Sequence, residues 1–214
     1  MSTISDQFGI DVDDSLIREY SEKPSIFCSR CGVRTAHIGI CPKCVESIER
    51  HINLTVPNEY RDKKLFPDEA LDRLCHGSHY FSGGVGSGKT QIAWSIYEYL
   101  WRKGMYPRFL YLPEYVNKVL SAFKIMDIVS LQIDSKDSNL LILDDLGAEL
   151  SDEKSRQIVL MLINGRYQHK LSTLINSNYE LAELGNAYDG RVMSRIAKMC
   201  KIHHLRSVDR RIPN

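Results

Sequence analysis

One run of eight residues has the composition of a loop that binds phosphate. It reads Gly83-Gly84-Val85-Gly86-Ser87-Gly88-Lys89-Thr90 and fits the pattern G-x-x-x-x-G-K-S/T at every position. Glycines let the backbone curl so that successive N–H groups point at phosphate oxygens, and the N-terminus of a following helix adds attraction for the anion. Lys89 is expected to contact the β and γ phosphates of ATP, and the Thr90 hydroxyl to coordinate Mg²⁺. The alternative is a glycine-rich turn without a ligand.

Two carboxylates follow a continuous apolar run later in the chain. The run is Leu140-Leu141-Ile142-Leu143, and Asp144 and Asp145 come directly after it. Such a run predicts a buried strand with the carboxylates at its end. Asp144 is expected to hold Mg²⁺ through water, and Asp145 to orient or deprotonate the water that attacks the γ-phosphate. The alternative is an acidic turn after a core strand.

Four of the six cysteines form two C-x-x-C pairs near the N-terminus: Cys28, Cys31, Cys41 and Cys44. Four thiolates in two such pairs suit a closed tetrahedral Zn²⁺ site that stabilises a segment too small for a conventional core. The separation between the pairs is shorter than in common zinc ribbons, which predicts a compact knuckle. A redox role for one pair is the alternative. His37, Cys75 and Cys200 are assigned no role.

The composition of the chain limits the classes of protein to which it can belong. The chain has 214 residues, 43% of them hydrophobic, which is enough for one main core and a small appendage. The formal net charge is +1, so the overall charge favours neither nucleic acid nor membrane as a partner. No apolar stretch approaches the roughly 20 residues that span a bilayer. We therefore expect a soluble, cytoplasmic protein.

Strands and helices alternate in the pattern typical of an α/β fold. The predicted strands cover residues 79–82, 109–112, 140–144, 174–177 and 201–205. The predicted helices cover residues 90–102, 113–123, 152–168 and 191–199, with Ser151 as a cap of the third. Two further helices are predicted at residues 15–20 and 45–51. A mostly parallel sheet with helices on both faces follows, with a domain boundary between residues 55 and 56.

With these motifs in hand, the chain resembles replicative helicase loaders of the DnaC and DnaI type. They are AAA+ proteins, in the branch that also holds the IstB-like helpers of transposases. The resemblance rests on the cysteine pairs, residues 56–62, the phosphate loop and residues 143–149. It implies a three-layer P-loop AAA+ core at residues 56–214 without the helical lid of larger relatives. Residues 1–55 are then an N-terminal arm and zinc module that binds a partner.

The resemblance also implies roles for residues outside the phosphate loop. Asn178 resembles the family's sensor 1 residue beside the attacking water, with an ordinary turn asparagine as the alternative. Arg195 resembles an arginine finger that acts on a neighbouring subunit's ATP, with Arg191 as the second choice. The alternative is a pair of solvated arginines. Arg210 resembles the sensor 2 arginine, with Arg211 as the other possible register.

The implied function is ATP-dependent delivery of a hexameric replicative helicase to single-stranded DNA, in a bacterial or phage-infected cell. Self-association through the ATP site is expected, because an arginine finger acts across a subunit interface. Hydrolysis is expected to be slow and partner-stimulated, because relatives often carry the longer Glu where this chain has Asp145. Lys118 and Lys124 are the cations nearest the expected DNA-binding segment, but they also fit the exposed face of an amphipathic helix. The alternatives are an IstB-like transposase helper and a nucleotide-regulated binding protein with negligible hydrolysis.

Overall fold

The computed structural model describes residues 26–35, 39–63, 66–121, 138–148, 153–185, 188 and 190–205. Contacts between residues divide the chain into two units, Met1–Ser47 and Ile48–Asn214, which are taken separately below. Several sequence predictions concern residues outside the described ranges: helix 15–20, His37, Lys124, Ser151, Arg210 and Arg211.

A five-stranded parallel sheet forms the centre of the larger unit. Its strands, in spatial order, are β4 (Arg108–Tyr111), β5 (Leu140–Leu146), β6 (Ser172–Ser177), β3 (Ser78–Ser82) and β7 (Cys200–His204). All five predicted strands are present with small shifts at their ends. Because β6 lies between β3 and β5, the ends of three strands meet at one edge of the sheet.

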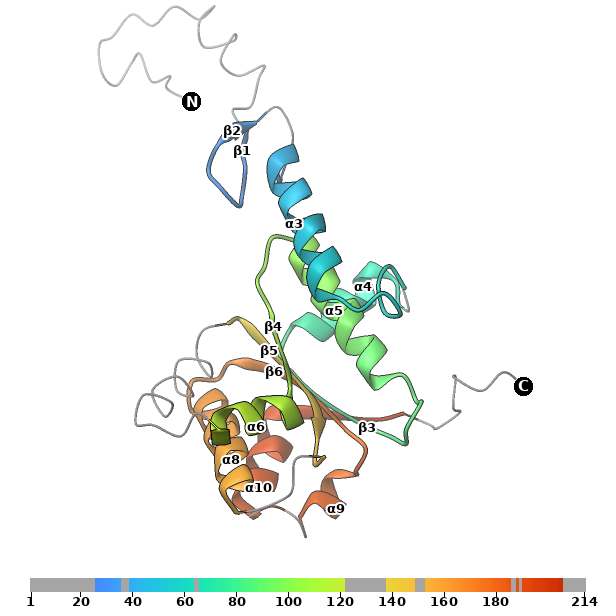
Figure 1. Cartoon of the computed structure of the whole chain (residues 1–214), viewed down its shortest axis with the longest axis vertical. Coiled ribbons are helices and arrows are strands. Elements are labelled where there is room, and N and C mark those ends of the chain that lie inside the picture. The colour runs from blue at the N-terminus through green and yellow to red at the C-terminus, as the bar shows by residue number, and fades with distance from the viewer. Residues whose placement is uncertain are drawn as a thin grey trace, which may run out of the picture. The chain divides into compact units, whose positions relative to one another are not determined.

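Helices cover both faces of this sheet (Figure 1). One face carries α4 (Asp68–Cys75) and α5 (Lys89–Arg102), and the other carries α6 (Leu112–Ser121), α8 (Glu153–Gln168) and α10 (Gly190–Met199), with the short α9 (Leu181–Leu184) beside α10. The predicted three-layer α/β architecture is confirmed. Helix α4 was not predicted, because it is short and Leu71 is its one buried residue.

The inner segments of β5 (Leu140–Leu143) and β6 (Leu174 and Ile175) are apolar because both faces of the sheet are covered there. Tyr80, Leu141, Leu143 and Ile175 are buried in one cluster with residues of α6, α8 and α10. Their neighbours along the strands point to the opposite face, toward α5, since side chains alternate across a sheet. This double burial fixes the register of the strands and therefore the positions of the side chains at their ends.

The smaller unit begins with two short antiparallel strands, β1 (Ile26–Phe27) and β2 (Arg34–Thr35). Helix α3 (Pro42–Thr55) follows and is longer than the predicted helix at residues 45–51. The division between the units falls inside this helix. The domain boundary at residues 55 and 56 remains a prediction. Among the described residues, no helix combines the length and apolar character that crossing a lipid bilayer requires.

Candidate functional site

The predicted phosphate loop connects the end of β3 to the first turn of α5. Gly86 and Gly88 have φ angles of 81° and 94°, in the left-handed region that glycine adopts without strain. Lys89 is only 7% exposed, and its ammonium donates hydrogen bonds to the carbonyls of Gly83 (2.7 Å) and Gly84 (2.9 Å). The loop therefore holds its lysine folded back on itself, at the place where a phosphate group would accept the same donors.

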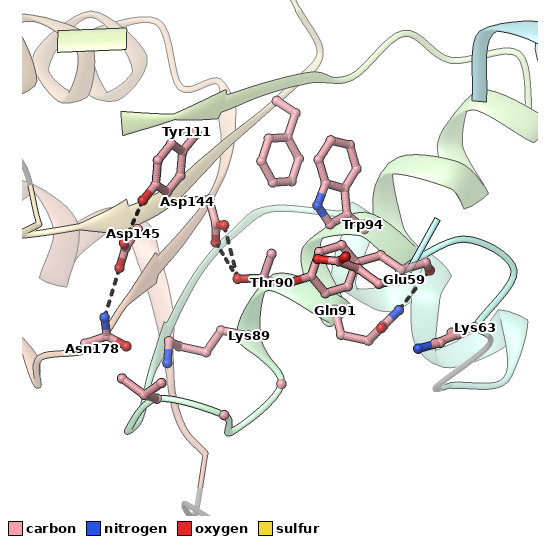
Figure 2. Close-up of a pocket in the computed structure, with 15 residues that line it drawn as sticks. Glu59, Lys63, Lys89, Thr90, Gln91, Trp94, Tyr111, Asp144, Asp145 and Asn178 are labelled. Atoms are coloured by element: carbon pink, nitrogen blue, oxygen red, sulfur yellow. Dashed lines mark hydrogen bonds between the residues drawn. The ribbon is translucent and has the colours of Figure 1, made fainter. Parts of the chain in front are cut away.

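The first carboxylate, Asp144, lies on β5 and faces the phosphate loop at Thr90 (Figure 2). Its Oδ2 accepts a hydrogen bond from Thr90 Oγ1 (3.1 Å), and its Oδ1 accepts one from Asn176 Nδ2 (2.7 Å). Burial raises the pKa of Asp144, and the donors of Asn176 and Thr90 oppose that rise. A carboxylate and a hydroxyl side by side are the hard oxygen ligands that Mg²⁺ prefers, so these two residues fit that ion.

The second carboxylate, Asp145, lies in an irregular part of β5, where the pairing with β6 shifts register between Leu143 and Leu146. Its φ of 65° is in the left-handed region, which Asp tolerates better than most residues. Asn178 Nδ2 donates to its Oδ1 (2.9 Å), and the Tyr111 hydroxyl donates to its Oδ2 (3.4 Å), as Figure 2 shows. The carboxylate is therefore held between the ends of β4 and β6.

These residues line one cavity of about 920 Å³, at the large end of the range for small-molecule sites. Lys89, Thr90 and both aspartates contribute to its wall. An aromatic wall adjoins them, where the rings of Trp94 and Phe109 stack with centroids 3.8 Å apart and planes 4° apart. The cavity therefore offers both a polar region that suits phosphates and flat apolar surfaces.

Residues 56–63, which we call the strap, run along α5 beside the cavity. Gln91 Nε2 donates to the Tyr60 carbonyl (3.0 Å), and Ser95 Oγ donates to the Lys63 carbonyl (3.1 Å). Tyr60 and Lys63 also line the cavity. The strap is thus fixed to the same helix that begins at the phosphate loop. This explains why residues 56–62 form a recognisable sequence segment.

Among the described residues, the predicted arginine-finger candidates Arg195 and Arg191 do not line this cavity. Arg195 lies on α10, where its Nη1 donates to the Arg191 carbonyl (3.1 Å) and its guanidinium lies 5.9 Å from the centre of the Tyr167 ring. Arg210 is outside the described residues. Within a single chain, the described structure therefore brings together the phosphate loop, both aspartates and Asn178, but not Arg195.

The four predicted metal ligands come together in the smaller unit. The sulfur atoms of Cys28, Cys31, Cys41 and Cys44 all lie within 4.8 Å of one another. Two sulfurs on a tetrahedral Zn²⁺ with bonds of 2.3 Å are about 3.8 Å apart, and the Cys31 and Cys41 sulfurs are separated by 3.8 Å. The Cys41 N–H donates to Cys28 Sγ (3.3 Å), which lowers the pKa of that thiol to about 6. The donor set fits a structural zinc site.

Sequence reasoning missed two residues that contact the aspartates. Asn176 follows the apolar pair Leu174 and Ile175 in β6. It lies two positions before Asn178 and on the same face of the strand, and this spacing could have drawn attention to it. Tyr111 is the last residue of β4. Its contact with Asp145 depends on β4 lying next to β5, which no local pattern indicates.

A parallel sheet with helices on both faces, a phosphate loop after β3 and aspartates at the end of β5 together define an AAA+ type of P-loop nucleotide-binding domain. The chain belongs to the family of IstB-like ATP binding proteins, whose model matches residues 80–210. This membership agrees with the resemblance identified from the sequence motifs. No match was found among proteins with curated functions.

Several solved structures share this fold. The chain is similar to the DnaC helicase loader, with a TM-score of 0.54 and 23% identity over 69% of this chain and 94% of that one. It is similar to DnaI, with a TM-score of 0.59 and 22% identity over 71% and 95%. It also resembles the replication initiator DnaA bound to AMPPCP and single-stranded DNA, with a TM-score of 0.55 and 21% identity over 77% and 50%. At these identities the likeness establishes the fold.

Proposed function

We propose that the protein is an ATP-dependent loader that binds a hexameric replicative helicase and delivers it to single-stranded DNA, with ATP hydrolysis controlling release. The observation that supports this most is the combination in one chain of two parts. A four-cysteine module precedes a nucleotide-binding domain that shares its fold with DnaC and DnaI. The cell would be a bacterium or a phage-infected bacterium, and the protein would act in its cytoplasm.

In this proposal, the phosphate loop binds the triphosphate of ATP. The Lys89 ammonium leaves the carbonyls of its own loop and donates to the β and γ phosphates. Thr90 and Asp144 hold the Mg²⁺ that accompanies the nucleotide, and that ion neutralises charge on the phosphate oxygens. The flat rings of the aromatic wall suit the non-phosphate part of the ligand.

Asp145 is the proposed base for the attacking water. Asn178 and Tyr111 donate one hydrogen bond to each carboxylate oxygen, which fixes the direction in which Asp145 points. Asn178 is also the proposed contact to that water. Because Asp is one methylene shorter than Glu, the carboxylate reaches less far toward the γ-phosphate, and turnover is expected to be slow without a partner.

Asp145→Asn is expected to reduce ATP hydrolysis by about 100-fold or more, because a positioned general base contributes roughly 10²- to 10⁴-fold to rate. ATP affinity should stay within about threefold of wild type, since the amide retains the size of the side chain and the phosphate loop is untouched. Phosphate release and fluorescent-nucleotide titration measure the two quantities. Tyr111→Phe, which removes one of the two donors, should give a smaller loss. Equal hydrolysis by Asp145→Asn and wild type would exclude Asp145 as the base.

We further propose that Arg195 completes the site of a neighbouring copy of this chain. It lies on α10, away from the cavity of its own chain, and its guanidinium would stabilise charge on the γ-phosphate of the neighbour. Arg210 is proposed to contact the nucleotide within its own chain. Hydrolysis would then depend on self-association, which couples turnover to assembly on the helicase and DNA.

The proposal predicts a nucleotide-dependent complex with the helicase, formed by the module at residues 1–55. Tagged protein should retain a cognate hexameric helicase in a pull-down, and the retained amount should differ at least severalfold between ATP and no nucleotide. A Cys28→Ser variant, which lacks one metal ligand, should lose the complex, while Cys75→Ser should keep it. Absence of helicase in every nucleotide state would overturn the loader function and leave the nucleotide-binding domain unaffected.

An IstB-like helper of a transposase is the second candidate, because the family model that matches residues 80–210 is the IstB-like one. Such a helper would use the same nucleotide site on duplex DNA. The four-cysteine module in front of the domain favours the loader. A complex with a transposase encoded beside this gene, together with no complex with a helicase, would decide for the helper.

A further inference from the structure

Asn176 is a fully buried amide in the centre of the sheet. It lies on β6, opposite Phe81 of β3, and none of its surface is exposed. Its Nδ2 donates to Asp144 Oδ1 at 2.7 Å. In the part of the chain that the structure describes, its Oδ1 has no hydrogen-bond partner. A buried oxygen without a donor destabilises a fold, so this amide is unfavourable for the sheet taken alone.

The direction of the amide follows from its partner. An ionised carboxylate only accepts hydrogen bonds, so Asn176 must present its N–H to Asp144, and its own oxygen must point the other way. The unpartnered oxygen is therefore a consequence of the contact with Asp144. An apolar side chain of similar size would fill the same space without leaving such an oxygen. The sequence nevertheless places an amide here, which indicates a role for the N–H that it donates.

The contact determines how the two oxygens of Asp144 are used. Oδ1 accepts the 2.7 Å hydrogen bond from Asn176 and lies 3.5 Å from the Thr90 hydroxyl, whereas Oδ2 is the oxygen nearer to that hydroxyl, at 3.1 Å. Rotation of the carboxylate would break the short hydrogen bond to Asn176. As a result, Oδ2 stays beside the Thr90 hydroxyl, and Asp144 and Thr90 both line the cavity.

We propose that Asn176 is a positioning residue that holds Asp144 so that its Oδ2, together with the Thr90 hydroxyl, receives the divalent cation of the bound nucleotide. This inference rests on the nucleotide binding proposed above and adds a residue that acts through Asp144. Groups that orient a metal-binding carboxylate by hydrogen bonding typically change metal affinity by about 10- to 100-fold when they are removed.

Binding of a fluorescent ATP analogue, measured at increasing Mg²⁺ and separately in EDTA, tests this role. Asn176→Leu keeps the branched shape of the side chain, is somewhat larger, and has no donor. It should raise the Mg²⁺ concentration for half-maximal binding by about 10- to 100-fold while leaving the affinity in EDTA unchanged. Asn176→Thr keeps a donor on a shorter side chain and should give an intermediate increase in the Mg²⁺ concentration for half-maximal binding. This variant provides the test if the leucine protein does not fold. Ser177→Ala is the matched control. Ser177 lies next to Asn176 on β6, and the change removes a buried hydrogen bond to the Leu146 carbonyl of β5.

The outcomes separate this inference from the proposed function. A Mg²⁺ requirement equal to that of wild type in both Asn176 variants would overturn the positioning role and leave nucleotide binding standing. An equal loss of affinity with Mg²⁺ and with EDTA would also overturn it, because that result describes a structural residue. If the wild-type protein bound the analogue without any response to Mg²⁺, the positioning role of Asn176 and the proposed Mg²⁺ ligands Thr90 and Asp144 would be wrong. If it bound no analogue in either condition, the proposed nucleotide site would be wrong.

Discussion

Lys89→Ala is expected to weaken ATP binding by roughly 10- to 150-fold, because hydrogen bonds to a charged group contribute about 1.5–3 kcal/mol. The ammonium is buried in the phosphate loop and is already directed at the loop's own carbonyls, 2.7 and 2.9 Å away. The phosphate oxygens of ATP are stronger acceptors than these carbonyls because they carry full charge. Titration with a fluorescent ATP analogue measures the effect.

Lys103→Ala is the matched control for this variant. Lys103 follows the last residue of α5, the helix that Lys89 begins, and it is exposed with its ammonium 5.2 Å from the Tyr99 ring. Its removal should leave ATP affinity unchanged. The melting temperature of each protein without nucleotide distinguishes lost binding from lost folding. Unchanged affinity in Lys89→Ala, with an unchanged melting temperature, would show that the loop does not bind the triphosphate.

Removal of one cysteine of the cluster is expected to unfold the smaller unit. A structural Zn²⁺ contributes about 10–16 kcal/mol of binding free energy that is also folding free energy. Within the described part of that unit up to Ser47, the buried hydrophobic side chains are those of Cys28 and Cys41, two of the four metal ligands. Cys31→Ser should therefore lose bound zinc and become sensitive to protease near residues 26–47.

The larger unit provides an internal control for the cysteine variant. Its core is independent of the cluster, so ATP binding by Cys31→Ser should remain within about twofold of wild type. Cys200→Ser, which alters a buried cysteine outside the cluster, should retain zinc. Zinc content by atomic absorption and the pattern of limited proteolysis give both results. A Cys31→Ser protein that kept one equivalent of zinc and resisted protease would contradict a four-cysteine structural site.

The parts of the site that the sequence predicted are those encoded locally. The phosphate loop is a contiguous motif whose glycines and lysine are adjacent in the chain, and the two aspartates directly follow the apolar run of their strand. Asn178 was predicted from a resemblance, and the structure brings it to Asp145. In each case, the residues that define the feature lie within a few positions of one another.

The parts that were missed depend on the order of strands in the sheet. Asn176 meets Asp144 only because β6 lies next to β5, and Tyr111 meets Asp145 only because β4 lies on the other side of β5. Strand order is a property of the whole domain, and the alternation of strands and helices does not determine it. The strap was visible as a sequence segment, but its hydrogen bonds to α5 were not, since they join residues far apart in the chain.

Steady-state phosphate release is the most direct test of whether the protein is an ATP-dependent loader. It would be measured for wild type and for Lys89→Ala, each alone, with single-stranded DNA, and with DNA and the hexameric helicase. The account predicts slow release by wild type alone, a clear change in rate when the partners are added, and background release by Lys89→Ala in every mixture. Release by wild type that stayed at the Lys89→Ala level with both partners present would contradict a working ATP-dependent loader and indicate a nucleotide-binding protein that does not turn over.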